Sequence, residues 1–308
     1  MYVFYRHTCT RTYVQTYIFI HYVLLLTCIY YPYVYIYIFI IQIVDVNFDF
    51  VDFNESCFHM TRQLISNSAW ASFGVSEITN AVIDQVAVGT VIKVDEAITG
   101  FITALNINNK NIKQSSKEMQ KFLLRTCPNA QKMNQILSNN RQNVGVLISE
   151  RLVNLPSELS PAMHRSFLDD IEWASGNTSG LNDSLRKELS FDYLIVFSTV
   201  YITGGNSNSS SGSKKKKKKK KKRSKKKQKI SNDGSSTNEQ IYYVKFEDEI
   251  LRDSATLSYT CPLRTSGIDT EPRSMGPFGI ESCLVMVLEI GKLKGCVERL
   301  SLLVQQQQ

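Results

Sequence analysis

The chain has 308 residues, enough for one large or two small domains with a substantial core, and a formal net charge of +8. Residues 214–229 alone carry 14 Lys and Arg and no acid, so the remainder has a net charge of 8 − 14 = −6. The basic character therefore belongs to one tract, and the partners of the tract and of the acidic body have to be considered separately.

The cysteines argue against a disulfide framework and against a zinc site. Their number is odd, no two form a CxxC motif, and none lies near a histidine at zinc-finger spacing. We therefore expect a reducing compartment and no metal ligands. The seven residues are Cys9, Cys28, Cys57, Cys127, Cys261, Cys283 and Cys296.

The N-terminal 43 residues form a segment rich in Tyr and Ile, and residues 12–44 contain no charged side chain. Arg6 and Arg11 precede this apolar run as in a signal anchor. Pro32 and the many tyrosines argue against a membrane-spanning helix, whose centre is built from Leu, Ala, Val and Phe. Two interpretations stay open, a membrane segment and translated non-coding sequence, and residues 1–43 are set apart from the fold.

Apolar periodicity predicts strands and helices that alternate along the chain. Helices are expected over 57–68, 76–86 with Ser76 as cap, 115–125 with Ser115 and Ser116 as caps, 130–137, 181–188 and 290–303. Strands are expected over 44–53, 88–94, 100–105, 144–155, 191–202, 241–245, 257–261 and 280–288.

Two strand pairings follow from the spacing. The strands at 88–94 and 100–105 are joined by a tight connection at Asp95 and Glu96, which predicts an antiparallel hairpin. The strand at 241–245 is expected to pair with the apolar strand at 191–202.

The stretch from Val144 to Trp173 is the predicted centre of the fold. Val144–Ile148 is an apolar run typical of a buried strand, residues 149–151 interrupt it, and residues 152–155 finish it. Ser157 then offers a cap for a helix whose apolar stripe is Leu159, Met163, Phe167 and Ile171. This indicates an α/β (α+β) fold with a mixed central sheet flanked by helices. His164, in that helix, is interpreted as a surface or core histidine and not as a catalytic base.

A cofactor site for acetyl-coenzyme A would need a glycine-rich turn at the start of this helix, where backbone N–H groups approach the pyrophosphate. The turn at 154–158 has no glycine, Pro156 removes a donor, and Glu158 repels an anion. The chain also lacks GxxxxGK[ST], GxSxG and HExxH motifs. We therefore predict a non-enzymatic protein without catalytic residues or cofactor, with a divergent acyltransferase-like enzyme as the alternative.

Clustered acidic residues are interpreted as solvated faces, because neighbouring residues on a helix do not converge on one site. Glu150 and Arg151 interrupt an apolar strand, so either they are paired within the structure or they contact a partner. The candidate partner-contact residues are Glu150, Arg151, Asp169, Asp170, Glu247, Asp248 and Glu249.

The lysine tract lies within residues 204–238, which are expected to form one disordered loop. Clustered ammonium groups favour nuclear import or polyanion binding, and the alternative is a low-complexity expansion. No aromatic residue is interleaved to stack on bases, which argues against specific nucleic-acid recognition. The candidate nuclear-localisation residues are Lys214, Lys218, Lys222, Arg223, Lys225, Lys226 and Lys227.

From Val44 to Leu303 the chain resembles the BCCIP family and its yeast counterpart. The resemblance rests on VGTVIKVDEAITGFITALNI (88–107), VGVLISERLVNLPSELSPAMHRSFLDDIEWA (144–174), FDYLIVFSTVYI followed by a Lys-rich insert, YYVKFEDEI (242–250) and CPLRTS. It implies one domain over 44–303 with an acetyltransferase-like (GNAT-like) fold that lacks a cofactor site, interrupted by the loop at 204–238 and followed by a Gln tail at 304–308.

The resemblance also implies a nuclear adaptor or chaperone that can shuttle to the cytoplasm. The implied partners are a cell-cycle inhibitor, a recombination-repair protein, a ribosomal protein and an import receptor. The implied roles are cell-cycle control, DNA repair by homologous recombination, spindle and microtubule organisation, nuclear export and ribosomal-protein chaperoning in ribosome biogenesis. The chain departs from the family pattern because the acidic N-terminal tail is absent and the acidic insert of the first hairpin is reduced to Asp95 and Glu96.

Overall fold

The computed structural model describes residues 11–22, 39–139, 141–176, 180–203, 240–263 and 279–306, with side chains from residue 46 onward. The predicted loop at 204–238, with its lysine tract, lies outside the described residues, as do Cys9 and Cys28.

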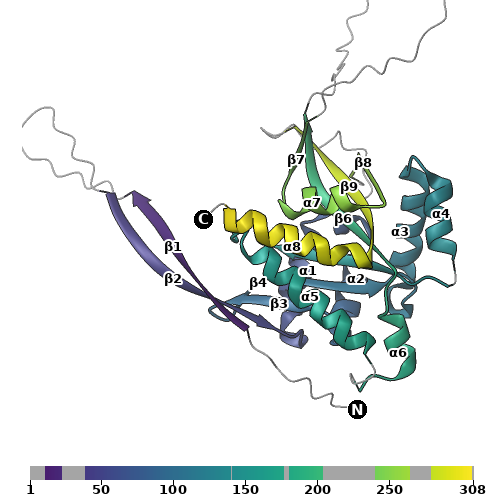
Figure 1. Ribbon diagram of the computed structural model, residues 1–308, viewed down its shortest axis with the longest axis horizontal. Helices are drawn as coiled ribbons and strands as arrows, with labels where there is room; N and C mark the ends of the chain where they lie inside the picture. The colour runs from purple at the N-terminus through teal and green to yellow at the C-terminus, as the bar shows by residue number, and fades with distance from the viewer. Residues whose placement is uncertain are drawn as a thin grey trace, which may run out of the picture.

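A mixed β-sheet forms the centre of the protein (Figure 1). The strand order is β1-β2-β3-β4-β5-β6-β9-β8, and β7 pairs with β6 off this path. Every pairing is antiparallel except that of β5 with β6. The strands are β1 (Arg11–Tyr22), β2 (Phe39–Val51), β3 (Thr90–Val94), β4 (Ala97–Asn106), β5 (Val144–Arg151), β6 (Tyr193–Thr203), β7 (Gln240–Tyr243), β8 (Leu257–Pro262) and β9 (Ile280–Glu289).

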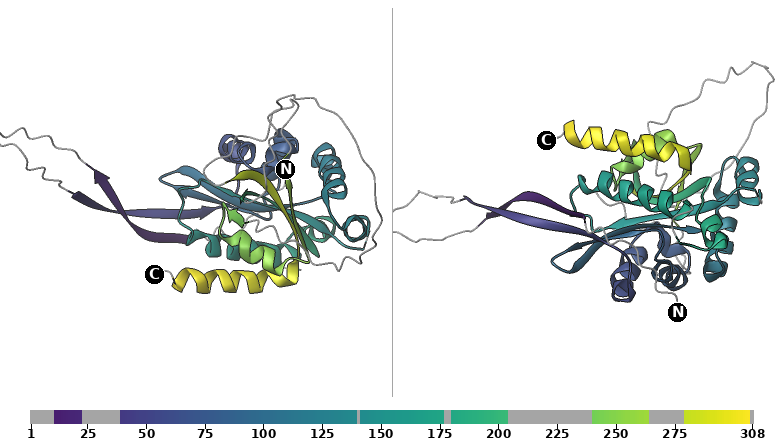
Figure 2. Two further views of the ribbon diagram at one scale, coloured as in Figure 1. Left: turned by 90° about the horizontal axis from the view of Figure 1, so that it is seen from above. Right: turned by 60° about the horizontal axis from the view of Figure 1, so that its bottom comes forward.

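Helices cover both faces of this sheet and make two separate cores (Figure 2). One face packs against α1 (Phe58–Ser66), α2 (Val75–Asp84), α3 (Lys113–Thr126) and α4 (Ala130–Ser138). The opposite face packs against α5 (Leu159–Ser175), α7 (Glu247–Ser254) and α8 (Ile290–Gln306), with α6 (Asp183–Glu188) at its end. This arrangement confirms the predicted α/β class with a mixed sheet flanked by helices.

The double covering explains why the central strands are apolar along their whole length. Successive side chains of a strand point to opposite faces, so a strand with helices on both sides needs an unbroken apolar run. In β9 every residue from Cys283 to Leu288 is buried, with odd-numbered positions in one core and even-numbered positions in the other. The buried stripe of α5, from Leu159 to Ile171, packs in the second core as predicted.

Two predicted pairings are confirmed. β3 and β4 form an antiparallel hairpin whose turn is Asp95 and Glu96, both with positive φ (46° and 68°). This left-handed backbone fits the twist of a tight hairpin and is tolerated best by Gly, Asn and Asp. β7 pairs with β6 from Tyr243↔Val200 to Gln240↔Thr203.

The predicted helix caps are wrong at Ser76, at Ser115 and Ser116, and at Ser157. α2 begins at Val75 after Gly74, which has φ 60°. Ser115 and Ser116 are buried inside α3. The carboxylate of Glu77 accepts hydrogen bonds from the N–H groups of Gln114 and Ser115 (3.1 and 2.7 Å). A side chain distant in sequence therefore satisfies the free donors at the start of α3.

Two further predictions around the central strand are corrected. β5 runs without interruption to Arg151, because residues 149–151 continue the ladder with β4 up to Gly100↔Arg151. Residues 152–155 then form a turn, closed by the N–H of Leu155 donating to the carbonyl of Leu152 (3.1 Å), and α5 begins at Leu159 with no side-chain cap. α7, at Glu247–Ser254, is a helix that the apolar pattern does not predict.

The N-terminal segment includes β1, which pairs with β2 as an antiparallel hairpin. β2 begins at Phe39, whereas the predicted strand begins at residue 44. In the part of the chain that the structure describes, no helix combines the length and apolar composition that a membrane crossing needs.

Candidate functional site

The central strands β5 and β6 diverge partway along their length. Their parallel pairing covers only four positions, from Val144↔Tyr193 to Leu147↔Val196. β5 then continues beside β4. β6 instead continues beside β9 and pairs with β7 near its end (Figure 1). The chain that follows β7 returns to the open side of β5, so the space between the diverging strands is occupied by residues 245–248, which we call the plug.

Two buried ion pairs hold the plug against β5. The Nζ of Lys245 lies 3.1 Å from Oε1 of Glu150 and donates to the carbonyl oxygen of Ser149 (2.5 Å). Arg151 donates to both carboxylate oxygens of Glu247, with 2.9 Å from Nη2 to Oε2. All four side chains are at most 10% exposed. Because buried charges are costly unless they are paired, these contacts decide the alternative left open for Glu150 and Arg151 in favour of pairing within the structure.

Further buried polar groups surround the plug. The hydroxyl of Ser198 on β6 donates to the carboxylate of Asp248. His164 on α5 is fully buried in the core. Its Nδ1 lies 2.8 Å from the carbonyl oxygen of Ser160. Its Nε2 and the Oγ of Ser149 are buried without a hydrogen-bond partner. The plug is thus tied to β5 and to β6, the two strands that it separates.

Burial and pairing shift the protonation of these groups in different directions. Burial alone would raise the pKa of Glu247, but the charge and hydrogen bonds of Arg151 lower it to about 2. Burial raises the pKa of Asp248 to about 7, although Lys245 opposes this. Burial lowers the pKa of His164, because the charged form of a histidine is the protonated one. Burial also raises the pKa of Glu150, against the charge of Lys245. The cluster thus brings together two cations, Lys245 and Arg151, and the carboxyl groups of Glu150, Glu247 and Asp248.

The interpretation of the acidic clusters as solvated faces is wrong for Asp170, Glu247 and Asp248, which are buried. Glu150, Arg151, Glu247 and Asp248 are the residues of the plug and its β5 partners. Asp170 is also buried and accepts a hydrogen bond from the N–H of Gly89 (2.9 Å), which ties α5 to the start of β3. Of the seven, only Asp169 and Glu249 are exposed.

Sequence reasoning did not identify Lys245 or Ser198 as members of this cluster. The available signal was a lone cation at the end of a predicted apolar strand, only two residues before the acidic run at 247–249. Among the described residues, no group of three His, Cys, Asp or Glu side chains is arranged to hold a metal ion.

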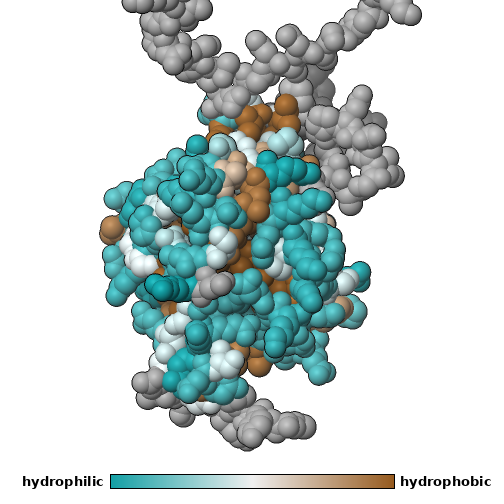
Figure 3. Space-filling model, turned by 90° about the vertical axis from the view of Figure 1, so that its right-hand side faces the viewer, coloured by the Kyte–Doolittle hydropathy of each residue, from teal (hydrophilic) through white to brown (hydrophobic). Residues whose placement is uncertain are grey.

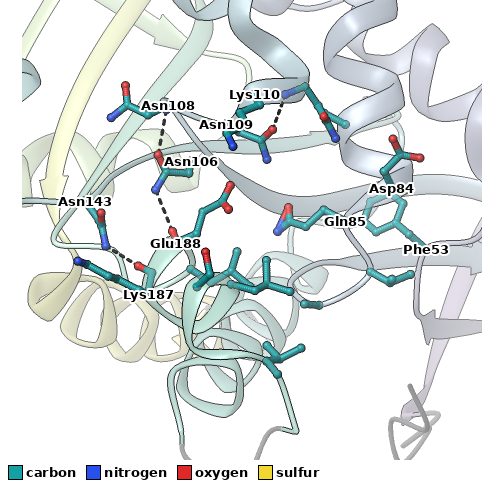
Figure 4. Close-up of a pocket in the computed structure, with 18 of the residues that line it drawn as sticks. Phe53, Asp84, Gln85, Asn106, Asn108, Asn109, Lys110, Asn143, Lys187 and Glu188 are labelled. Atoms are coloured by element: carbon teal, nitrogen blue, oxygen red, sulfur yellow. Dashed lines mark hydrogen bonds between the residues drawn. The ribbon is translucent and has the colours of Figure 1, made fainter. Parts of the chain in front are cut away.

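A cleft of about 900 Å³ lies at the opposite end of β5, between the end of α2, the loop that follows β4, and α6 (Figure 4). Its floor is apolar and includes Phe53, Leu185 and Leu189. Val86, 49% exposed, stands at its rim. On the face that carries α3, α4 and α6, apolar side chains show as a narrow band between hydrophilic ones (Figure 3).

Amide side chains build the wall of the cleft and fix α6 in place. Asn106 donates to the carbonyl oxygen of Glu188 (2.9 Å), and Asn143 donates to those of Lys187 (2.5 Å) and Ser190 (2.9 Å). The Nε2 of Gln85 donates to the carbonyl oxygen of Ala104 (3.0 Å), which leaves its Oε1 buried and without a hydrogen-bond partner. The cleft therefore combines a fixed frame, an apolar floor and one unused acceptor.

Replacing Lys245 with Met tests the plug. The substitution keeps the aliphatic stem and leaves Glu150 as a buried charge with no cation beside it, so we expect a loss of about 3–5 kcal/mol in the free energy of unfolding. Adding Glu150→Gln should recover at least about 1 kcal/mol, because it removes the uncompensated charge. Urea unfolding measures both values.

Arg299→Met is the matched control, because Arg299 pairs with Asp253 at 3.3 Å on the surface, where both side chains are about half exposed. Its cost should stay below about 1 kcal/mol. If Lys245→Met destabilises the protein no more than Arg299→Met, the ion pair does not hold the plug.

The raised pKa of Asp248 predicts a pH-dependent stability. Between the ordinary value of 3.8 and about 7, the folded state keeps a proton that the unfolded state has lost. This contribution is present at low pH and declines as pH rises through that window, by at most about 1.4 kcal/mol per pH unit. Asp248→Asn keeps an acceptor for Ser198 and removes the decline. Its stability relative to the unsubstituted protein should therefore rise between about pH 4 and about pH 7 in urea unfolding; a difference independent of pH would contradict the assignment.

Comparisons with known proteins agree on one family. A model of the BCCIP family matches residues 43–251. The Protein BCCIP homolog of Arabidopsis thaliana is 25% identical over 261 residues, covering 81% of this chain and 72% of its own length. Protein BCP1 of Yarrowia lipolytica is 27% identical over 228 residues, covering 69% and 66% respectively. The crystal structure of BCP1 from Saccharomyces cerevisiae shares the fold, with a TM-score of 0.55 and 16% identity over 83% of this chain and 88% of that one. The suspected resemblance is confirmed, and the chain belongs to the BCCIP family.

Proposed function

We propose that this protein is a non-enzymatic adaptor or chaperone that acts in the nucleus by binding other proteins. Family membership supports a protein-binding role. The single structural observation that carries the proposal is the plug, because it fills the gap between the diverging central strands with the chain's own side chains.

An enzyme that held a cofactor between these strands would need that space to be free. Here the space is filled by the side chains of Lys245, which donates to the carbonyl oxygen of Ser149, and of Glu247, which accepts from Arg151. Opening the gap would break two buried ion pairs, at a cost of about 3–5 kcal/mol each. The alternative of a divergent acyltransferase-like enzyme is therefore not favoured.

Within the adaptor role, the family resemblance supports more specific proposals. The partners would be a cell-cycle inhibitor, a recombination-repair protein and a ribosomal protein, and the processes would be cell-cycle control, repair, spindle organisation, nuclear export and ribosomal-protein chaperoning. The lysine tract would bind an import receptor, since the body outside it has a net charge of −6 and supplies no other concentrated basic segment.

For the binding surface we propose the cleft beside α6, with an extended segment of a partner protein as occupant. Extended segments that bind to proteins place side chains into pockets, and these pockets give the specificity. An apolar side chain of the same segment would cover Phe53 and Leu185 on the floor. The frame is held by hydrogen bonds from Asn106 and Asn143, so little ordering of this surface is needed on binding.

Import is tested by replacing residues 214–229 with a Gly/Ser segment of equal length in a tandem fluorescent fusion too large to diffuse through the nuclear pore. The ratio of nuclear to cytoplasmic fluorescence should fall, because the clustered charges that the receptor recognises are gone. Replacing residues 305–308 with Gly/Ser is the control and should leave the ratio unchanged. Undiminished nuclear enrichment without the lysines would refute the import role.

The cleft is tested with Val86→Arg, which places a charge at the apolar rim. Val153→Arg is the matched control, since Val153 is 89% exposed and does not line the cleft. We expect Val86→Arg to weaken partner binding about tenfold, equivalent to about 1.4 kcal/mol, with little effect from Val153→Arg. Quantitative mass spectrometry of proteins that co-purify with each variant measures this, provided that both variants unfold at the same urea concentration. Equal recovery of partners by the two variants would exclude the cleft as the binding surface.

A further inference from the structure

Two cysteines face each other across the last strand pair of the sheet. Cys261 on β8 and Cys283 on β9 are directly opposed in the antiparallel register. Both are free thiols and buried, with exposed fractions of 8% and 2%. β8 ends the strand order of the described sheet, so the pair joins this edge strand to its neighbour β9.

The register alone brings the two residues within bonding geometry. Directly opposed residues of antiparallel strands have Cα atoms about 4.5 or about 5.5 Å apart, depending on the hydrogen-bonding position. A disulfide accepts Cα separations of about 4.4–6.8 Å, so either position allows the bond without a shift of the strands. Both side chains belong to the same hydrophobic core, so the two sulfur atoms lie on the same face of the sheet.

The surroundings shift the pKa values of the two thiols in opposite directions. The hydrogen bond from Cys283, aided by Thr126 and the charge of Arg125, lowers the pKa of Cys261. The same bond and burial raise the pKa of Cys283. Cys261 is therefore the better nucleophile and also the more exposed of the two.

We propose that Cys261 and Cys283 form a redox-modification site that low-molecular-weight disulfides such as glutathione disulfide convert to an intramolecular disulfide bond. The thiolate of Cys261 attacks one sulfur of glutathione disulfide, forming a mixed disulfide and releasing one glutathione. The thiol of Cys283 then loses its proton and attacks the Cys261 sulfur, which releases the second glutathione. Two thiols are oxidised, one glutathione disulfide is reduced to two glutathione molecules, and the electrons and protons balance.

The bond would lock the edge of the sheet. It would close a covalent ring through the connection between β8 and β9, and it would fasten β8, which pairs with β9 alone among the described strands. A disulfide restricts the unfolded chain, and for a ring of this size the effect corresponds to a rise in Tm of roughly 5–10 °C. This site is independent of the plug and of the cleft, and it does not depend on the proposed function.

The test uses the full-length protein equilibrated with glutathione disulfide, then blocked with an alkylating reagent and digested with trypsin. Cys261 and Cys283 fall in separate tryptic peptides, residues 253–264 and 274–292. Mass spectrometry should find these peptides joined, and the join should disappear on reduction. The oxidised protein should also melt at a higher temperature than the reduced protein.

Cys127 supplies the matched control, because it is a third free and buried thiol in the same hydrophobic core. Cys127→Ser should keep the joined peptides and the Tm rise, and Cys261→Ser should lose both. Unjoined peptides in the unsubstituted protein, or peptides joined through Cys127, would overturn the proposal. The peptide analysis of the unsubstituted protein decides the matter even if a serine variant folds poorly.

Discussion

The structure depends on the buried contact between the plug and β5. β5 and β6 part after four paired positions, and an open gap in the middle of a sheet would expose both cores to water. Lys245 and Glu247 close it by pairing with Glu150 and Arg151, which lie on opposite faces of the same strand. Removing one residue of such a pair strongly destabilises the folded protein, because the remaining buried charge has neither water nor a counter-ion to stabilise it.

The two ends of β5 therefore serve different purposes. At its start, Asn143 and Asp192 join the paired ends of β5 and β6, with the N–H of Asn143 donating to Asp192 at 2.7 Å, and this frame carries α6 and the cleft. At its end, the ion pairs hold the plug and, through it, β7. The segment that contains the lysine tract connects β6 to β7, which pair from Val200↔Tyr243 to Thr203↔Gln240.

Most of the buried charged side chains in the described part of this chain are paired with another protein group. The carboxylates of the plug are balanced by cations, Asp170 is held by Gly89, and Glu77 caps α3. Buried polar atoms without a hydrogen-bond partner include the Oε1 of Gln85, the Oγ of Ser149 and the Nε2 of His164. The opposed thiols on β8 and β9 are the groups for which we propose a reagent.

The sequence by itself determined the α/β class, most of the strands and helices, the hairpin at Asp95 and Glu96, and the pairing of β7 with β6, because periodicity and turn chemistry are local properties of the chain. It also carried the family resemblance. Only the tertiary structure decided that Glu150 and Arg151 meet Lys245 and Glu247, that Glu77 replaces the serines as a cap, and that α7 is a helix. Whether an acidic residue is solvated or buried depends on which residues from distant parts of the chain pack beside it. The local sequence pattern does not contain this information, because such contacts form only when the chain folds.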